Sequence, residues 1–257
     1  MNSYFDWAGV LTGAPRAWLI SGLLTTAWVT LAGIIIATLF TVLLLGLRLA
    51  GGRAGRVIAA SWVSVFRNTP LLVQLLFWYF AAWNTLPQSW RGFINDDRSW
   101  SQLPGGVWWL TPEFLCAAWG LGLFTSAFLV EEIRSGLQAV PKGQTEAALS
   151  QGFSNWQLFR SVLLPQGGVN AWQPVVGQYL NLMKLSSLAT GIGFAELTSQ
   201  VRRIESFNSH ALAAFAVGTV LYLLLGLAMS GLFTLFAPGR RGQRKPAAMR
   251  QEAQHDS

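Results

Sequence analysis

Two long stretches without charge constrain this chain more than any other feature. No acidic or basic side chain occurs from Ala17 to Leu47, and none but His210 from Phe207 to Gly239. Each stretch exceeds the roughly 20 residues that a helix needs to cross the hydrocarbon core of a bilayer. Only 11% of the residues are charged, whereas a soluble domain carries about 25%. The sequence therefore predicts an integral membrane protein that contacts lipid.

Five apolar or moderately polar stretches predict an all-α, polytopic fold with about five membrane-spanning helices. They cover Trp18 to Leu47, Val57 to Trp83, Pro112 to Glu132, Val169 to Leu185 and Ala211 to Phe236. An odd number of spans places the two termini on opposite sides. Because lysine and arginine collect in cytoplasmic loops, their distribution predicts an external N-terminus.

The predicted organisation has three parts. An external segment covers residues 1–17, a transmembrane domain covers 18–237 and includes a cytoplasmic loop over 136–168, and residues 238–257 form a basic tail that we expect to be disordered and cytoplasmic. A second, external loop from Asn84 to Thr111 is rich in Trp, Pro and Gly. Its tryptophans either lie at headgroup level or contact an external partner.

Several classes of function lack the residues they need. The formal charge of +7 comes from basic residues spread over short loops and the tail, so the chain has no basic stripe for nucleic acid. Cys116 is the only cysteine, and His210 and His255 form no metal-ligand cluster with it. No catalytic constellation marks the spans. We therefore expect a chain that is not an enzyme and binds no cofactor or metal.

The loop between the third and fourth spans reads as helix, turn, helix. Pro141 can begin the first helix, and Gly152 can end it in a left-handed conformation. Ser154 with Gln157 fits a capping box that begins a second helix, and Pro165 is expected to end it. Such a hairpin, with Phe153, Trp156 and Phe159 exposed, suits a groove on a soluble partner. The alternative is an amphipathic helix lying on the membrane surface.

The second and fourth spans are too polar to face lipid, which predicts that they face the interior of the bundle or a wet cavity. Asn170, Gly177, Asn181 and Lys184 fall on one stripe of the fourth helix. Candidate pathway residues are Arg67, Asn68, Thr69, Gln74, Asn181, Lys184, Ser186, Ser187 and Thr190. Arg67 and Lys184 would attract a carboxylate there. Alternatively, both lie near helix ends and extend to the headgroups.

Two backbone irregularities fall within these spans. Pro70 predicts a kink or a restart near Thr69, so Arg67 and Gln74 share a face only if the helix continues. The stretch from Ser186 to Gly193 holds two glycines and three hydroxyl side chains. It is either unwound backbone that can bind a polar solute or a plain junction between helix and loop.

The spacing of the hairpin resembles a known motif. Glu146-Ala147-Ala148, three residues, Gly152, nine residues, an aliphatic residue, one residue and Leu164-Pro165 are similar to the coupling motif of binding-protein-dependent ATP-driven importers. Phe66 to Gln74 and Lys184 to Leu188 resemble the polar amino acid branch of that family.

Further stretches narrow the resemblance. Val140 to Gln144 is usual in the polar amino acid branch. Gly122 to Ser126 and Phe77 to Phe80 look most like glutamate and aspartate permease subunits, although Leu185 and Ser186 depart from the usual continuation after the lysine. A different amino acid therefore stays open.

The resemblance implies the fold of a type I importer permease in a bacterial inner membrane. An external binding protein would deliver the amino acid, a second permease subunit, identical or homologous, would complete the path, and a pair of cytoplasmic ATPases would drive it. The residues implied to contact the ATPase are Glu146, Ala147, Ala148, Gly152, Phe153, Leu164 and Pro165. The chain contains no Gly-x-x-x-x-Gly-Lys-Ser/Thr motif, so ATP hydrolysis is expected on a separate chain.

The alternative from another class is a secondary transporter or channel driven by an ion gradient. Such proteins need acidic residues at mid-membrane, and the nearest candidates, Glu131 and Glu132, fall at the inner end of the third span.

Overall fold

The structure, a computed structural model, describes residues 6–96 and 98–238, and these residues are mostly helical. The first half contains α1 (Trp7–Leu11), α2 (Gly13–Ala50), α3 (Gly52–Asn68), α4 (Leu71–Leu76), the π-helix η1 (Phe77–Ala82), the 3₁₀ turn η2 (Trp83–Thr85), α5 (Gln88–Asn95), the 3₁₀ turn η3 (Ser99–Ser101), β1 (Gln102–Leu103) and β2 (Val107–Trp108). The second half contains α6 (Pro112–Gln138), α7 (Lys142–Ser150), α8 (Asn155–Leu158), the π-helix η4 (Phe159–Leu163), α9 (Leu164–Leu185), the 3₁₀-helix η5 (Ser186–Ile192), α10 (Leu197–Asn208) and α11 (Ala211–Leu235). The all-α prediction is confirmed, and the described residues add one small antiparallel pair of strands.

Three of the described helices, α2, α6 and α11, are long and apolar enough to cross a membrane. α2 begins at Gly13, earlier than the sequence indicates, and α9 begins at Leu164 rather than at Val169. α3, α4 and α9 are shorter or more polar, so the count of five spans stays a prediction. The predicted tail lies outside the described residues apart from Pro238.

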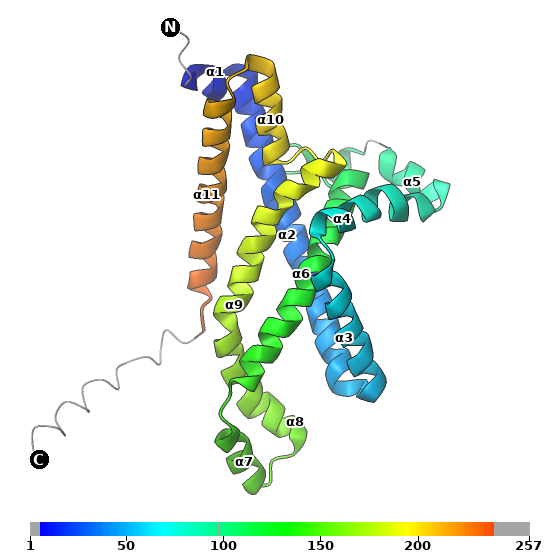
Figure 1. Cartoon of the computed structure of the whole chain (residues 1–257), viewed down its shortest axis with the longest axis vertical. Helices are drawn as coiled ribbons and strands as arrows, with labels where there is room; N and C mark the ends of the chain where they lie inside the picture. The colour runs from blue at the N-terminus through cyan, green and yellow to red at the C-terminus, as the bar shows by residue number, and fades with distance from the viewer. Residues whose placement is uncertain (1–5, 97, 239–257) are drawn as a thin grey trace, which may run out of the picture.

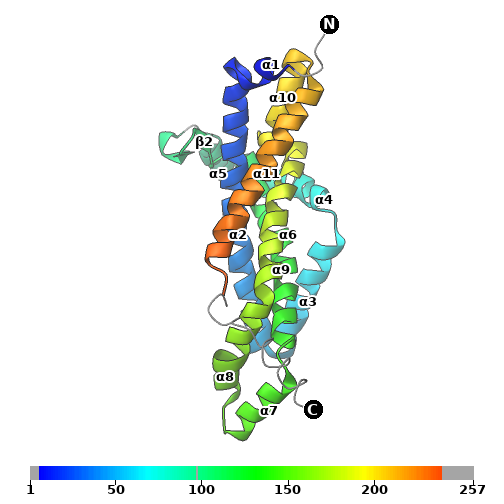
Figure 2. The ribbon, with the colours of Figure 1, turned by 90° about the vertical axis from the view of Figure 1, so that its left-hand side faces the viewer.

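The helices form an elongated bundle in which α2, α6 and α9 run along the length (Figure 1). α7 and α8 lie at one end, and α1 and α10 lie at the other. Figure 2 shows α5 and β2 on one side of the bundle and α3 and α4 on the other. The bundle therefore separates the α7–α8 hairpin from the elements that follow α9.

Small residues let α6 lie at the centre of the bundle. A Cβ on Gly122 would lie 2.5 Å from Cγ2 of Ile36, and one on Gly120 would lie 2.8 Å from Cδ2 of Leu75. In a bilayer, helices associate through such close packing, because lipid removes the hydrophobic driving force between them. α6 is consequently buried along most of its length.

α6 and α9 pack tightly against each other at a pair of glycines. A Cβ on Gly136 would lie 2.7 Å from the carbonyl oxygen of Gly167, and a Cβ on Gly167 would lie 2.8 Å from Cα of Leu137. The Asn170 amide donates to the Gly136 carbonyl at 3.3 Å. Neither glycine has room for a side chain, so this crossing holds the two helices at a fixed contact point.

The predicted break in the second span is confirmed. Thr69 and Pro70 are extended, and α4 restarts at Leu71. The chain then passes through a π-helix and a 3₁₀ turn before α5. Arg67 and Gln74 therefore lie on two separate helices and share no helical face.

The segment from Asn84 to Thr111 is more ordered than the loop that its composition predicts. It forms α5 and a hairpin of β1 and β2, whose turn uses Gly105 and Gly106 with positive φ. The Trp28 indole donates to the Pro104 carbonyl at 3.0 Å and fastens the hairpin to α2. The exposed tryptophans of this segment are Trp90, Trp100 and Trp108.

Candidate functional site

The turn that ends α7 has the geometry predicted for it. Gly152 has φ +81°, and its amide donates to the Leu149 carbonyl at 2.9 Å. The Phe153 amide donates to the Ala148 carbonyl at 3.1 Å, which completes a Schellman motif. Because the left-handed conformation disfavours any residue with a Cβ, a glycine is the natural choice here.

The capping box that begins α8 is also confirmed. The Gln157 side chain accepts from the Ser154 amide at 2.8 Å, and the Ser154 hydroxyl accepts from the Gln157 amide at 3.3 Å. Both bonds join residues three apart in sequence. The turn of the hairpin is therefore specified by a few adjacent residues.

The prediction that Pro165 ends the second helix of the hairpin is wrong. The backbone keeps right-handed helical torsions at Leu158, Phe159, Leu163 and Leu164, so α8, η4 and α9 follow one another without a break. Pro165 lies in the first turn of α9, where its fixed φ suits a helix. The π-helical turn η4 lies just before it, where the missing amide hydrogen bond of proline would otherwise interrupt a regular α-helix.

The surface of the hairpin (residues 142–163) is partly exposed. Glu146, Ala147 and Gly152 are exposed, whereas Ala148 is buried. Of the three aromatic residues predicted to be exposed, Trp156 is 65% exposed, while Phe153 and Phe159 are half-buried. Leu164 and Pro165, the last residues of the motif, are exposed at the start of α9.

Trp156 stacks on Phe159 with ring centroids 5.9 Å apart, and this contact covers part of Phe159. The expectation of a fully exposed aromatic surface therefore needs correction. One aromatic side chain and a small-residue turn remain accessible to a partner.

The polar residues around the break in the second span mainly cap α3. The buried Gln74 side chain donates to the carbonyls of Phe66 and Thr69 and to the Thr69 hydroxyl at 3.1, 3.2 and 2.6 Å. Asn68 donates to the Ser64 carbonyl at 2.8 Å. These bonds satisfy carbonyl groups that the end of a helix leaves free.

Arg67 and Asn68 line a pocket of about 340 Å³ together with Val63, Ser64 and Phe128. The Arg67 guanidinium lies 5.2 Å from the centroid of the Phe128 ring. No carboxylate within residues 6–96 and 98–238 forms a salt bridge with it. This pocket, which we call the Arg67 pocket, thus offers one cation without an acidic partner among the described residues.

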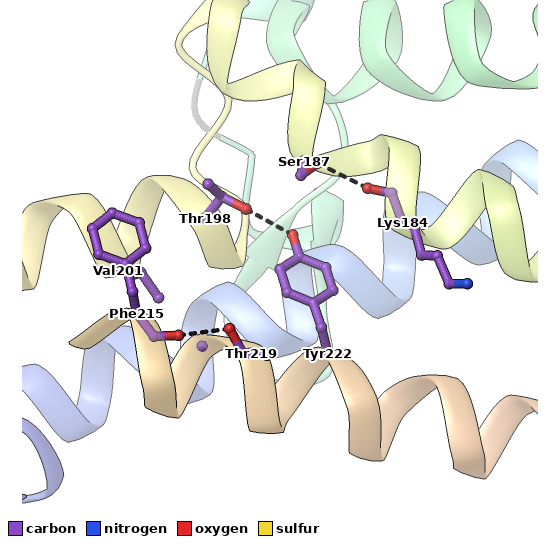
Figure 3. A pocket seen from close by; sticks show the side chains of 8 residues that line it. Lys184, Ser187, Thr198, Val201, Phe215, Thr219 and Tyr222 are labelled. Atoms are coloured by element: carbon purple, nitrogen blue, oxygen red, sulfur yellow. Dashed lines mark hydrogen bonds between the residues drawn. The ribbon is translucent and has the colours of Figure 1, made fainter. Parts of the chain in front are cut away.

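Lys184 lines a different pocket, of about 290 Å³, between α9 and α11 (Figure 3). The residues that line this Lys184 pocket are Lys184, Ser187, Thr198, Val201, Phe215, Gly218, Thr219 and Tyr222. The structure therefore places the two predicted cations, Arg67 and Lys184, in separate pockets. Asn181 lies on α9 about one turn before Lys184 and is exposed, but it lines neither pocket.

The stretch from Ser186 to Gly193 is neither unwound nor a plain loop. It tightens into the 3₁₀-helix η5, which ends at Gly193 with φ +80°. The Ser186 hydroxyl donates to the Met183 carbonyl at 2.7 Å and is fully buried, so it faces no pocket. Thr190 donates to a carboxylate oxygen of Glu196 at 2.5 Å.

Glu196 is the site residue that the sequence reasoning missed. It is fully buried, and its carboxylate caps α10 by accepting from the amides of Thr198 and Ser199 at 2.9 and 2.8 Å. Tyr222 of α11 donates to the same carboxylate at 2.5 Å. The sequence does carry a signal for Glu196. It is an acidic residue close to a membrane-spanning stretch, and it stands just before Thr198 and Ser199.

The acidic pair near the end of α6 is engaged within the chain. Glu131 forms ion pairs with Arg134 at 2.6 Å and with Arg48 at 3.4 Å. Glu132 accepts from the Gln178 amide of α9 at 3.0 Å. Both carboxylates thus hold neighbouring helices together.

Comparison with known proteins gives matches over most of the chain. The family described as "Binding-protein-dependent transport system inner membrane component" matches residues 31–242. The glutamate/aspartate import permease protein GltJ of Escherichia coli (strain K12) is 29% identical over 241 residues, which cover 91% of this chain and 94% of that protein. The glutamine transport system permease protein GlnP of the same strain is 30% identical over 226 residues, covering 88% and 93%.

Solved structures give a consistent result. The crystal structure of an amino acid ABC transporter with histidines contains a chain with a TM-score of 0.68 and 28% identity, covering 86% of this chain and 92% of that one. A chain of the inward-facing MetNI methionine ABC transporter has a TM-score of 0.61 at 18% identity, covering 88% and 98%. This second likeness shows the fold alone.

Proposed function

Because the chain belongs to the family of binding-protein-dependent transport system inner membrane components, we propose that it forms part of the membrane path of an ATP-driven importer for a polar amino acid. An external binding protein delivers the amino acid, and a separate pair of ATPases on the cytoplasmic side supplies the energy. A second permease subunit, a copy of this chain or a homologue, completes the path.

The observation that carries this proposal is the α7–α8 hairpin. Its exposed Glu146, Ala147 and Gly152 lie at one end of the bundle (Figure 1). The helix that follows its turn continues without a break into α9, which ends beside the Lys184 pocket. A soluble partner that moves the hairpin would therefore move the wall of a pocket at the other end of α9.

Glutamate or aspartate is the first candidate substrate, and glutamine is the second. The relatives named above that import these amino acids are 29% and 30% identical to this chain, so identity alone does not separate them. The cations at Arg67 and Lys184, which form no salt bridge within the described part of the chain, suit a carboxylate, which all three amino acids carry. Selection between them would also depend on the binding protein.

Replacement of Gly152 by Trp tests the role of the hairpin. A residue with a Cβ in the left-handed conformation costs roughly 1–2 kcal/mol, and the indole would add bulk to an exposed turn. We expect ATP-driven uptake by the complete transporter in proteoliposomes to fall at least about tenfold, while the protein still inserts into the membrane.

The matched control is Gly46→Trp, because Gly46 of α2 is exposed and has open space where a Cβ would be. This control should keep wild-type uptake. If Gly152→Trp kept both uptake and normal ATPase binding, the hairpin would not be the coupling element.

A further inference from the structure

The Glu196 carboxylate has a hydrogen-bond donor at each of its four acceptor positions. One oxygen accepts from the Thr190 hydroxyl at 2.5 Å and the Ser199 amide at 2.8 Å. The other accepts from the Tyr222 hydroxyl at 2.5 Å and the Thr198 amide at 2.9 Å. Two ionised carboxylate oxygens offer about four lone-pair positions, so this environment fits a carboxylate.

Glu196 thereby fixes the direction of the neighbouring hydroxyl groups. A tyrosine hydroxyl has one proton, and Tyr222 uses it for Glu196. The Thr198 hydroxyl lies 3.0 Å from the Tyr222 oxygen and must therefore be the donor of that pair. The resulting chain runs from Thr198 to Tyr222 to Glu196 and leaves only lone pairs on Thr198 for a ligand.

The other hydroxyl groups of the Lys184 pocket are committed in the same way. Ser187 donates to the Lys184 carbonyl at 2.8 Å, and Thr219 donates to the Phe215 carbonyl at 2.8 Å (Figure 3). Such bonds to the preceding turn of a helix are common for serine and threonine. The hydroxyl groups of Thr198, Ser187 and Thr219 therefore have only lone pairs left to offer a ligand.

Lys184 supplies the opposite kind of group. Its ammonium offers three donors and no acceptor, and no salt bridge joins it to a carboxylate among the residues that the structure describes. Its side chain extends from α9 toward α11 (Figure 3). The pocket thus combines one cation with several oxygen atoms that can only accept hydrogen bonds.

We propose that Glu196 is a positioning residue that makes the Lys184 pocket selective for an α-amino acid zwitterion. The carboxylate of the ligand binds Lys184, and its ammonium group binds the lone pairs of Thr198, Ser187 and Thr219. This inference rests on the proposed transport function and goes beyond it, because it assigns both charged groups of the substrate to one pocket. A ligand without the ammonium group keeps the contact with Lys184 but loses the contacts with the three hydroxyl groups.

Two variants test this role. Tyr222→Phe removes the acceptor of Thr198 and frees that hydroxyl to donate into the pocket. Glu196→Gln keeps the shape of the side chain but replaces one of the two acceptor oxygens by an NH₂ donor. The hydroxyl that donates to that oxygen, either that of Tyr222 or that of Thr190, then has to rotate away. Thr30→Val is the control, since the buried Thr30 hydroxyl on α2 has no hydrogen-bond partner among the residues described, and Thr30 lines no part of the pocket.

The measurement is equilibrium binding to the assembled transporter in lipid nanodiscs, without ATP and without the binding protein. The probes are L-glutamate and L-glutamine, each compared with its analogue that lacks the α-amino group, glutarate and 5-amino-5-oxopentanoate. We expect the wild type and Thr30→Val to prefer the amino acid. Tyr222→Phe and Glu196→Gln should lower that preference about tenfold, with affinity for the deaminated analogues retained.

Three outcomes would overturn the inference: no preference in the wild type, an unchanged preference in Tyr222→Phe, or an equal loss of both kinds of ligand, which would show a purely structural role. If Glu196→Gln fails to fold, Tyr222→Phe decides, because it leaves no buried charge unpaired.

ATP-driven uptake by the wild type separates this test from that of the proposed function. If the complete transporter takes up no amino acid, the proposed function itself fails. If uptake occurs and the preference does not change in the variants, only the role of Glu196 is lost.

Discussion

The α7–α8 hairpin and the Lys184 pocket lie at opposite ends of α9 and are built by different kinds of interaction. The bonds that shape the turn of the hairpin join residues three to five apart, as between Ser154 and Gln157. Around the pocket, Tyr222 reaches across 26 positions to Glu196. The Leu197 amide reaches Thr26, which is 171 positions away in the sequence.

This difference has a mechanical meaning. A turn held by its own neighbours can keep its shape while it moves as a unit against a partner. A pocket held by bonds between α2, η5, α10 and α11 changes shape whenever these helices shift. The hairpin is therefore suited to receive a displacement, and the pocket is suited to respond to one.

Glu196→Ala should have the largest effect on stability, because it removes the acceptor shared by four donors. Buried donors without partners and a lost helix cap together cost about 3 kcal/mol or more. A fall in the thermal unfolding midpoint of the purified transporter would measure this. Glu205→Ala on the same helix is the control, since its side chain is only partly buried. Equal shifts in both variants would contradict a network centred on Glu196.

Gly167→Ala should have the next largest effect, because its Cβ would lie 2.6 Å from Cδ2 of Leu137. Overpacking of this kind costs about 1–3 kcal/mol. Gly168→Ala is a control one residue further along the same helix, where a Cβ meets open space. That control should be neutral or stabilising by up to about 1 kcal/mol. The same thermal unfolding measurement applies, and similar midpoints for the two variants would argue against a tight crossing.

Ser154→Ala should cost about 1 kcal/mol, because it removes half of the capping box. The effect should stay local, with faster hydrogen exchange at the amides of 154–158 and little change around the Lys184 pocket. Ser161→Ala, at an exposed serine of η4, should leave exchange unchanged. Faster exchange that spreads to η5 and α10 would show that the two regions are not independent.

Lys184→Gln should have the smallest effect on stability, within about 0.5 kcal/mol, because the ammonium loses no salt bridge to any residue that the structure describes. Its effect should appear in uptake, as a KM raised about tenfold by the loss of a charge-assisted contact. Arg67→Gln, alone and combined with Lys184→Gln, shows whether the Arg67 pocket belongs to the same path. Arg53→Gln, at an exposed position, is the control. Unaltered uptake kinetics in the double variant would remove both cations from the solute path.

The sequence predicts those features that depend on interactions between residues close together in the chain, and it fails for those that depend on distant residues. The left-handed Gly152, the capping box and the break at Thr69 depend on adjacent residues, and all three are found. Polarity alone assigns Gln74 and Thr190 to the solute path, but the structure commits their side chains to Thr69 and Glu196.

Two other features depend on contacts that adjacent residues do not reveal. Proline usually ends a helix, and only the π-helical turn before Pro165 shows why α9 continues the hairpin helix. Glu196 gives a weak signal by itself, because its importance comes from Tyr222 on another helix. The roles of Arg67 and Lys184 in transport stay predictions.

The glycine crossing of α6 and α9 gives the molecule a pivot. From Gly167 to Lys184, α9 extends about 26 Å at 1.5 Å per residue. A tilt of about 10° around this fixed point would swing the Lys184 end of the helix by roughly 4–5 Å. Because Lys184 and Ser187 line the pocket, such a tilt would change the spacing between α9 and α11 there.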